Sequence, residues 1–147
     1  MSLPLYGIDR EIHNRIKAKY DPERERQARE YIETVTGESF PSEDFRESLK
    51  DGVLLCKTLN QVLPGEVSYR ESKMPFVQME NIAAFLRGAE KLGMPKHDLF
   101  QTVDLYEGKN MVQVIDTIFS FSRHAVKHGF EGPVLGPKLV DKNPRKE

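Results

Sequence analysis

The sequence predicts an all-α protein, and three observations support this fold class. Apolar residues recur every three or four positions along most of the chain, as they do on one face of a helix. Residues that favour helix starts and ends, such as the pair Asp21-Pro22 and the single Gly37, stand at the borders of these periodic segments. No segment alternates apolar and polar residues between turn signals in the way that predicts a β-strand.

The first predicted helix covers residues 8–20, where an isoleucine or tyrosine recurs every fourth position between charged residues. This thin apolar seam predicts an amphipathic helix that packs on the surface of the domain. The second helix begins at Pro22 and ends before Gly37. Its predicted buried face consists of Ala28, Tyr31, Ile32 and Val35.

The chain is organised around the stretch from Asp44 to Gly65, DFRESLKDGVLLCKTLNQVLPG. It predicts a short helix, a tight bend at Asp51-Gly52, and a second helix that runs to about Val62. We interpret Asp51 as a capping or turn residue rather than a binding residue. The predicted core stripe consists of Phe45, Leu49, Val53, Cys56, Leu59 and Leu63.

A polar, irregular segment follows at residues 66–75, and the next helix is expected over residues 78–92, with Phe76 and Phe85 enlarging its apolar contact. Its predicted face consists of Met79, Ile82, Ala83, Leu86, Ala89 and Leu92. Short turns are expected at residues 97–100 and 104–105. The last helix, over residues 109–128, is apolar over more than half of its circumference, which predicts a central position.

These elements divide the chain into three parts. Residues 1–21 form the amino-terminal amphipathic helix packed on the domain, residues 22–129 form the domain proper, and residues 130–147 form an extended, basic tail rich in glycine and proline.

The composition excludes several classes of protein. A length of 147 residues with 38% hydrophobic residues fits one compact domain. The net charge of -1 provides no overall basic field for nucleic acid. The single cysteine, Cys56, fits a buried thiol and a reducing cytosol, and no run of about 18 apolar residues predicts a membrane span or an export signal.

Two pairs of side chains have residue types and spacings that occur in reactive sites. His124 and His128 have the spacing of two metal ligands on a helix, but no third ligand is indicated nearby, and a role at the helix end is favoured. Asp104 and Glu107 have no nucleophile, phosphate-binding loop or metal cluster to work with. We therefore expect no enzyme, no cofactor and no metal site.

The residues as a whole resemble the calponin homology domain, in particular the transgelin and calponin subgroup and its fungal transgelin-like members. The likeness rests on LKDGVLLCKTLNQVLPG, on PFVQMENIAAFLRGAEKLGMP and on LFQTVDLYEGKNMVQVIDTIFSF, in this order. The flanking segments YGIDREIHNRIKAKYDPERERQAREYI and GFEGPVLGPKLVDKNPRK are similar to those of the subgroup.

This resemblance implies a compact bundle of four main helices and a few short ones. It also implies an actin-filament-binding module of a transgelin-like protein that organises or cross-links the cytoskeleton. The expected partner is filamentous actin, with no nucleic acid and no membrane, and the chain is expected to be a cytoplasmic monomer. The alternative is a scaffold or signalling adaptor that binds a protein other than actin. Microtubule binding is a third and less favoured function, because the domain lacks the broad positive charge that tubulin's acidic tails would attract.

The candidate actin-binding residues are basic. The tail carries four cations and one acid over residues 138–146, which suits an acidic filament surface, although a solvated end of the chain is an equal alternative. The amino-terminal helix is a second candidate surface, diluted by nearby acids. The residues selected are Lys138, Lys142, Arg145, Lys146, Lys17 and Lys19.

Overall fold

The computed structural model describes residues 11–12, 15 and 18–136. Within these residues every regular element is helical, and the prediction of an all-α fold is confirmed. Four main helices, α2, α4, α5 and α7, are joined by the shorter α3, η1 and α6. Their bounds are α2 Pro22–Thr36, α3 Phe45–Leu49, α4 Val53–Val62, α5 Pro75–Leu92, η1 Lys96–Asp98, α6 Thr102–Tyr106 and α7 Met111–Lys127.

The first main helix, α2, has the ends that the sequence predicts. The side chain of Asp21 accepts a hydrogen bond of 2.9 Å from the backbone N–H of Glu23, and Pro22 occupies the first turn. At the other end Gly37 has a φ of 73°, and its N–H donates to the carbonyl oxygen of Glu33 at 2.8 Å. Hydrogen bonds between residues close in the sequence therefore determine where α2 begins and ends.

The bend between α3 and α4 requires glycine for two reasons. Gly52 has a φ of 78°, which side chains rarely allow. A Cβ at this position would also lie 2.6 Å from the Cβ of Asn81 and 2.8 Å from the backbone nitrogen of Ile82 in α5. Beside it, the carboxylate of Asp51 accepts from the N–H of Val53 at 2.9 Å, so the predicted local role of Asp51 is confirmed.

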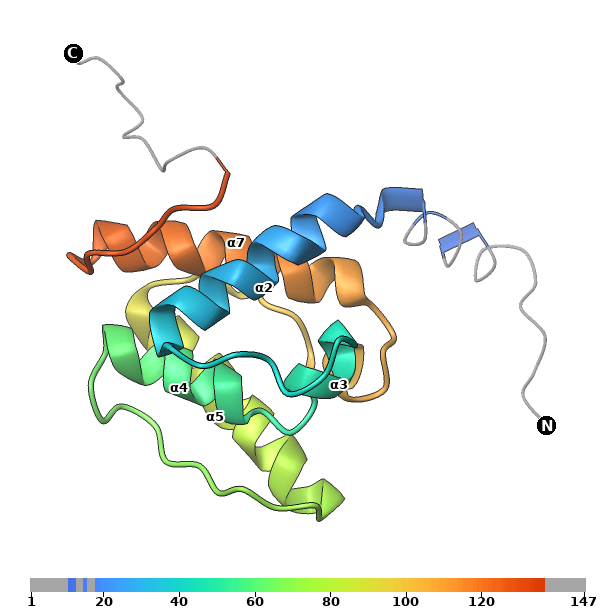
Figure 1. Cartoon of the computed structure of the whole chain (residues 1–147), viewed down its shortest axis with the longest axis horizontal. Helices are drawn as coiled ribbons and strands as arrows, with labels where there is room; N and C mark the ends of the chain where they lie inside the picture. Colours follow the sequence, from blue (N-terminus) through green and yellow to red (C-terminus); the bar gives the residue numbers. More distant parts are fainter. Residues whose placement is uncertain (1–10, 13–14, 16–17, 137–147) are drawn as a thin grey trace.

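The core lies between α2 and α7 on one side and α4 and α5 on the other (Figure 1). Seven of the ten residues of α4 are buried, which places this helix at the centre, as predicted. Aromatic rings tie the main helices together. Tyr31 of α2 meets Phe121 of α7 edge-on at 6.4 Å, and Phe121 lies 5.8 Å from Phe85 of α5.

The α5 helix corrects two expectations. It begins at Pro75 rather than at residue 78, because proline is well suited to the first helical position. Its buried face also differs from the predicted one. Phe76 is 74% exposed, and Met79 is exposed as well, so neither side chain enlarges the contact with the core. The residues of α5 that are buried are Val77, Asn81, Ile82, Ala84, Phe85, Gly88, Ala89 and Leu92.

The two ends of the described chain differ in their contacts. Ile12 and Tyr20, which belong to the predicted amino-terminal seam, are 47% and 38% exposed, so these two side chains are not covered by the domain. The segment after α7 lies against the bundle as far as Gly136. There the N–H of Leu135 donates to Ser122 Oγ at 2.8 Å. The predicted three-part division of the chain stays a prediction.

Candidate interaction surface

The start of α5 is fixed by polar contacts in the segment before it. Ser72 Oγ accepts from the N–H of Met74 at 3.0 Å, and Gln78 Nε2 donates to the carbonyl oxygen of Ser72 at 2.8 Å. Met74, at the N-cap position, has extended backbone angles and no side chain caps the helix. The chain therefore enters α5 in a defined direction, although the residues before it have no regular secondary structure.

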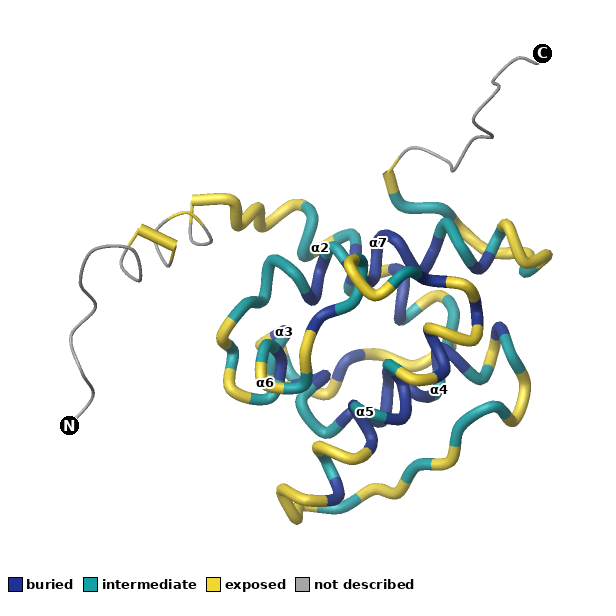
Figure 2. Tube along the Cα trace, turned by 180° about the vertical axis from the view of Figure 1, so that it is seen from behind, coloured by how far each residue is buried: buried dark blue, intermediate teal, exposed yellow. Residues whose placement is uncertain are grey.

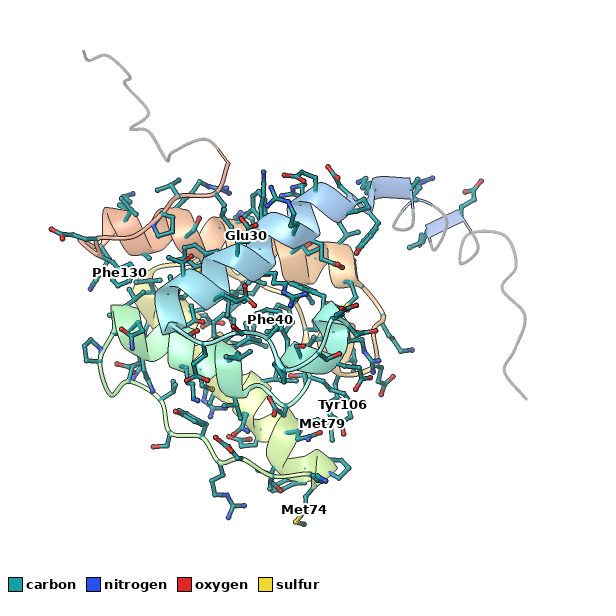
Figure 3. The ribbon with its side chains drawn as sticks, in the orientation of Figure 1. Glu30, Phe40, Met74, Met79, Tyr106 and Phe130 are labelled. Carbon is teal, nitrogen blue, oxygen red and sulfur yellow. The ribbon has the colours of Figure 1, made fainter. Side chains whose placement is uncertain are left out.

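This local structure places large apolar side chains in solvent. Phe76 and Met74 are 74% and 62% exposed, and Met79 follows one turn later at 36%. Figure 2 shows the exposed residues at this tip of the bundle, and Figure 3 shows Met74 extending from it. We call Met74, Pro75, Phe76 and Met79 the apolar patch. Contiguous exposed apolar side chains of this kind are typical of interaction sites.

Basic side chains lie beside the apolar patch in the sequence. Arg70 and Lys73 are exposed and have no ion-pair partner in the part of the chain that the structure describes. Glu80 is paired with Arg87 at 2.8 Å, while Glu71 lies between the two free cations. The surroundings of the patch therefore carry a small excess of positive charge.

Sequence reasoning missed this surface because the buried face of α5 includes an asparagine and a glycine. Asn81 is buried with its amide satisfied, since Nδ2 donates to the carbonyl oxygens of Asp51 at 2.9 Å and Arg70 at 2.7 Å. Gly88 is buried against α4, where Leu59 approaches so closely that a Cβ at residue 88 would lie 1.9 Å from Leu59 Cδ2. The signal that could have found the patch is the spacing of Val77, Asn81, Ala84 and Gly88, which places Phe76 on another side of the helix.

Most of the predicted basic site lies outside the described residues. Lys19 is described and is exposed in a helical segment. The structure does not describe the other five residues, so it does not bring the predicted site together. These five are Lys17, Lys138, Lys142, Arg145 and Lys146.

Asp104 and His124, two of the four side chains considered as reactive groups, have structural contacts. Asp104 Oδ2 accepts from the N–H of Gln101 at 2.7 Å, which caps α6. His124 Nδ1 lies 3.0 Å from the carbonyl oxygen of Ser120 on the preceding turn. In residues 18–136 and the few described before them, no three His, Cys, Asp or Glu side chains are grouped as metal ligands.

The single thiol is held in its neutral form. Cys56 is buried, and its Sγ lies 3.2 Å from the carbonyl oxygen of Asn81, to which the thiol donates. Burial raises the pKa of Cys56 to about 12. A thiol in this state is a poor nucleophile and a poor metal ligand.

None of the described helices has the length and apolar character that crossing a membrane requires.

Comparison with known proteins identifies the family to which the chain belongs. The model of the calponin homology (CH) domain matches residues 22–127, which include every helix from α2 to α7. The chain belongs to the calponin homology domain family. This family consists of structural and binding domains rather than enzymes.

The relatives place the chain among the transgelin-like members of this family. It is 46% identical over 125 residues to transgelin of Schizosaccharomyces pombe, covering 82% of this chain and 71% of the relative. Myophilin of Echinococcus granulosus is 41% identical over 146 residues, covering 97% of this chain and 77% of the relative. Muscle-specific protein 20 of Drosophila melanogaster is 41% identical over 138 residues, covering 92% and 75%.

Solved structures show the same fold. The calponin-homology domain of an IQGAP protein from S. pombe matches with a TM-score of 0.65 and 29% identity, over 82% of this chain and 76% of the other. The calponin-homology domain of Rng2 from S. pombe matches with a TM-score of 0.67 and the same identity and coverage. The resemblance that the sequence blocks suggest is therefore confirmed.

Proposed function

We propose that this chain is an actin-filament-binding module that organises or cross-links the actin cytoskeleton. The observation that carries the proposal is the match to the calponin homology domain across all the main helices, together with 46% identity to a transgelin. In this proposal the chain is a cytoplasmic monomer that binds the filament and catalyses no reaction.

The apolar patch supports binding to a filament. Phe76 and Met74 are exposed at a helix start whose backbone is already ordered, so a partner that covers them costs mainly the rotamer freedom of their side chains. Arg70 and Lys73 are free to face an acidic protein surface. The proposed contact therefore has an apolar centre with a basic rim, as many protein interfaces do.

The basic tail supplies the second part of the proposed contact. Lys138, Lys142, Arg145 and Lys146 add positive charge with only Asp141 opposing them before Glu147. Such charges raise the rate of encounter with an acidic filament, and salt screens them.

Co-sedimentation with filamentous actin over a salt series tests the proposal. We expect saturable pelleting that weakens as salt increases, and absence of pelleting above background at low salt would exclude direct binding. Low-speed pelleting in the same samples reports cross-linking into bundles. Recovery of a regulatory protein but no actin from a pull-down would favour the adaptor alternative.

The contribution of the apolar patch is tested by Phe76→Ser, with Val103→Ser as the matched control. Val103 is also an exposed apolar side chain, but it belongs to another helix, α6, and is not part of the apolar patch. We expect Phe76→Ser to weaken filament binding about fivefold or more, as at an interface hot spot. Neither variant should change the free energy of unfolding by more than about 0.5 kcal/mol. Equal affinities of the two variants would remove the patch from the proposed contact.

A further inference from the structure

A groove of about 470 Å³ runs between the irregular segment after α4 and the helix α5. The lining residues come from residues 66–70 on one side and from α5 on the other. Figure 1 shows the irregular segment that connects the end of α4 to the start of α5. The lining residues that matter here are Ser68, Tyr69, Arg70, Val77, Ala84 and Arg87.

Two asparagine side chains fix the segment that forms the outer wall of the groove. Asn60 Oδ1 accepts from the N–H of Val67 and Asn60 Nδ2 donates to the carbonyl oxygen of Val67, both at 3.0 Å. Asn81 holds Arg70 in the same way. Asn81 Oδ1 accepts from the N–H of Arg70 at 3.1 Å, and Asn81 Nδ2 donates to the carbonyl oxygen of Arg70 at 2.7 Å. Each side-chain amide thus replaces the hydrogen bonds that a neighbouring strand would make.

Between these two clamps the backbone has unused hydrogen-bonding groups. The N–H and C=O groups of Ser68 and Tyr69 make no hydrogen bond to any other described residue. A short piece of chain whose backbone is held in place and left unpaired resembles the edge of a β-sheet, to which an extended peptide can add.

The side chains of the groove indicate the chemistry of such a peptide. Val77 and Ala84 supply an apolar floor, while Arg70, Arg87 and Lys91 line the groove with positive charge. Arg87 pairs with Glu80 at 2.8 Å and Lys91 pairs with Glu66 at 2.9 Å. The Arg87–Glu80 pair is exposed on both sides, whereas the side chain of Glu66 is only 28% exposed. An exposed pair contributes only about 0–1 kcal/mol, so a ligand carboxylate can replace Glu80 at Arg87. Because Arg70 has no ion-pair partner among the described residues, the groove keeps an excess of positive charge.

We propose that this groove binds an extended, acidic peptide segment of a partner protein. The peptide backbone pairs with the free N–H and C=O groups of Ser68 or of Tyr69, because adjacent residues of an extended segment present these groups to opposite edges. An apolar side chain of the peptide rests on Val77 and Ala84, and its carboxylates bind Arg70 and Arg87. The peptide is a second kind of partner, and the groove shares Arg70 and Phe76 with the surface proposed for the filament, so the two partners would compete for these residues.

Titration of the ¹⁵N-labelled full chain with a synthetic peptide tests the proposal. The probe is an acetylated, amidated hexapeptide that alternates acidic residues with valine and leucine, and the control peptide has lysine at each acidic position. We expect saturable shifts of the Ser68 and Tyr69 amide signals with the acidic peptide at low salt, and none with the basic one. Equal binding of both peptides, shifts confined to another face, or no saturable shift would overturn the proposal.

The double variant Arg70→Ala, Arg87→Ala tests the role of the cations, and Arg26→Ala is the matched control. Arg26 is an exposed, ion-paired arginine on α2, away from the groove. We expect at least tenfold weaker peptide binding in the double variant and unchanged binding in the control. Thermal unfolding of each variant shows that the fold is retained. A double variant that binds the acidic peptide as the unchanged chain does would contradict the proposed site.

Discussion

At the scale of the residue, α4 and α5 pack closely against each other. Leu59 has no exposed surface, and its Cδ2 occupies the place that a Cβ at Gly88 would need. The helices can approach this closely only because residue 88 has no side chain. Leu59 is therefore a sensitive reporter of the packing of the whole core.

We predict that Leu59→Ala lowers the free energy of unfolding by about 2–5 kcal/mol, since it removes a fully buried side chain and leaves a cavity. Urea denaturation monitored by circular dichroism measures the change, with Phe76→Ala as a control that should differ little. A loss below about 1 kcal/mol would show that α4 is not the centre of the core.

The buried thiol gives a second prediction at this scale. The pKa of Cys56 is raised from its ordinary value of 9.0 to about 12 by burial, so the folded state holds this proton more tightly than the unfolded state. The resulting stabilisation is complete below pH 9.0 and is lost as the pH rises from 9.0 towards 12. We expect Cys56→Ala to show a shallower loss of stability above pH 9.0 in urea titrations. An unchanged slope would contradict this assignment.

The sequence does not predict the burial of every side chain correctly. Apolar spacing identified Leu59 and Cys56 as core residues, but it assigned Phe76 to the core as well. The reason is that the burial of Asn81 depends on backbone groups of Asp51 and Arg70, far from it in the chain. Periodicity cannot detect a polar residue that is buried because distant backbone groups need its amide.

At the scale of the element, the helix ends follow local rules more closely than the helix faces do. The start and end of α2, the bend at Gly52 and the end of α5 at Gly93 lie where capping residues predict them. The start of α5 differs from the prediction, which places Pro75 in the preceding loop, because proline also suits the first helical turn.

We predict that Asp21→Ala lowers the free energy of unfolding by about 1 kcal/mol, because it leaves the N–H of Glu23 without its side-chain acceptor. Asp21→Asn should restore most of the loss, since the asparagine side chain also accepts a hydrogen bond. Chemical denaturation of the three proteins measures the difference. An alanine variant as stable as the unchanged chain would show that water replaces the cap fully.

At the scale of the whole molecule, the sequence predicted the class of fold and the family. It did so through three ordered blocks of residues, and the family match across residues 22–127 confirms them. The sequence could not show how the surfaces are arranged, because exposure depends on which helix faces meet. The apolar patch and the groove became visible only from the packed structure.

The tail is the remaining prediction at this scale. Replacing Lys138, Lys142, Arg145 and Lys146 with alanine should weaken filament binding and reduce its dependence on salt, because these charges attract an acidic surface. Thermal stability should not change. Co-sedimentation at several salt concentrations measures both effects, and an unchanged affinity and salt dependence would remove the tail from the mechanism.

The two asparagine clamps also determine how the protein exchanges hydrogen with solvent. The amide hydrogens of Val67 and Arg70 are bound to side-chain oxygens although their segment has no regular secondary structure. They should exchange as slowly as amides in a helix, while those of Ser68 and Tyr69 between them exchange rapidly. This irregular loop thus contains two protected amides, which open only when the packing of α4 and α5 is disturbed, and a short exposed window between them.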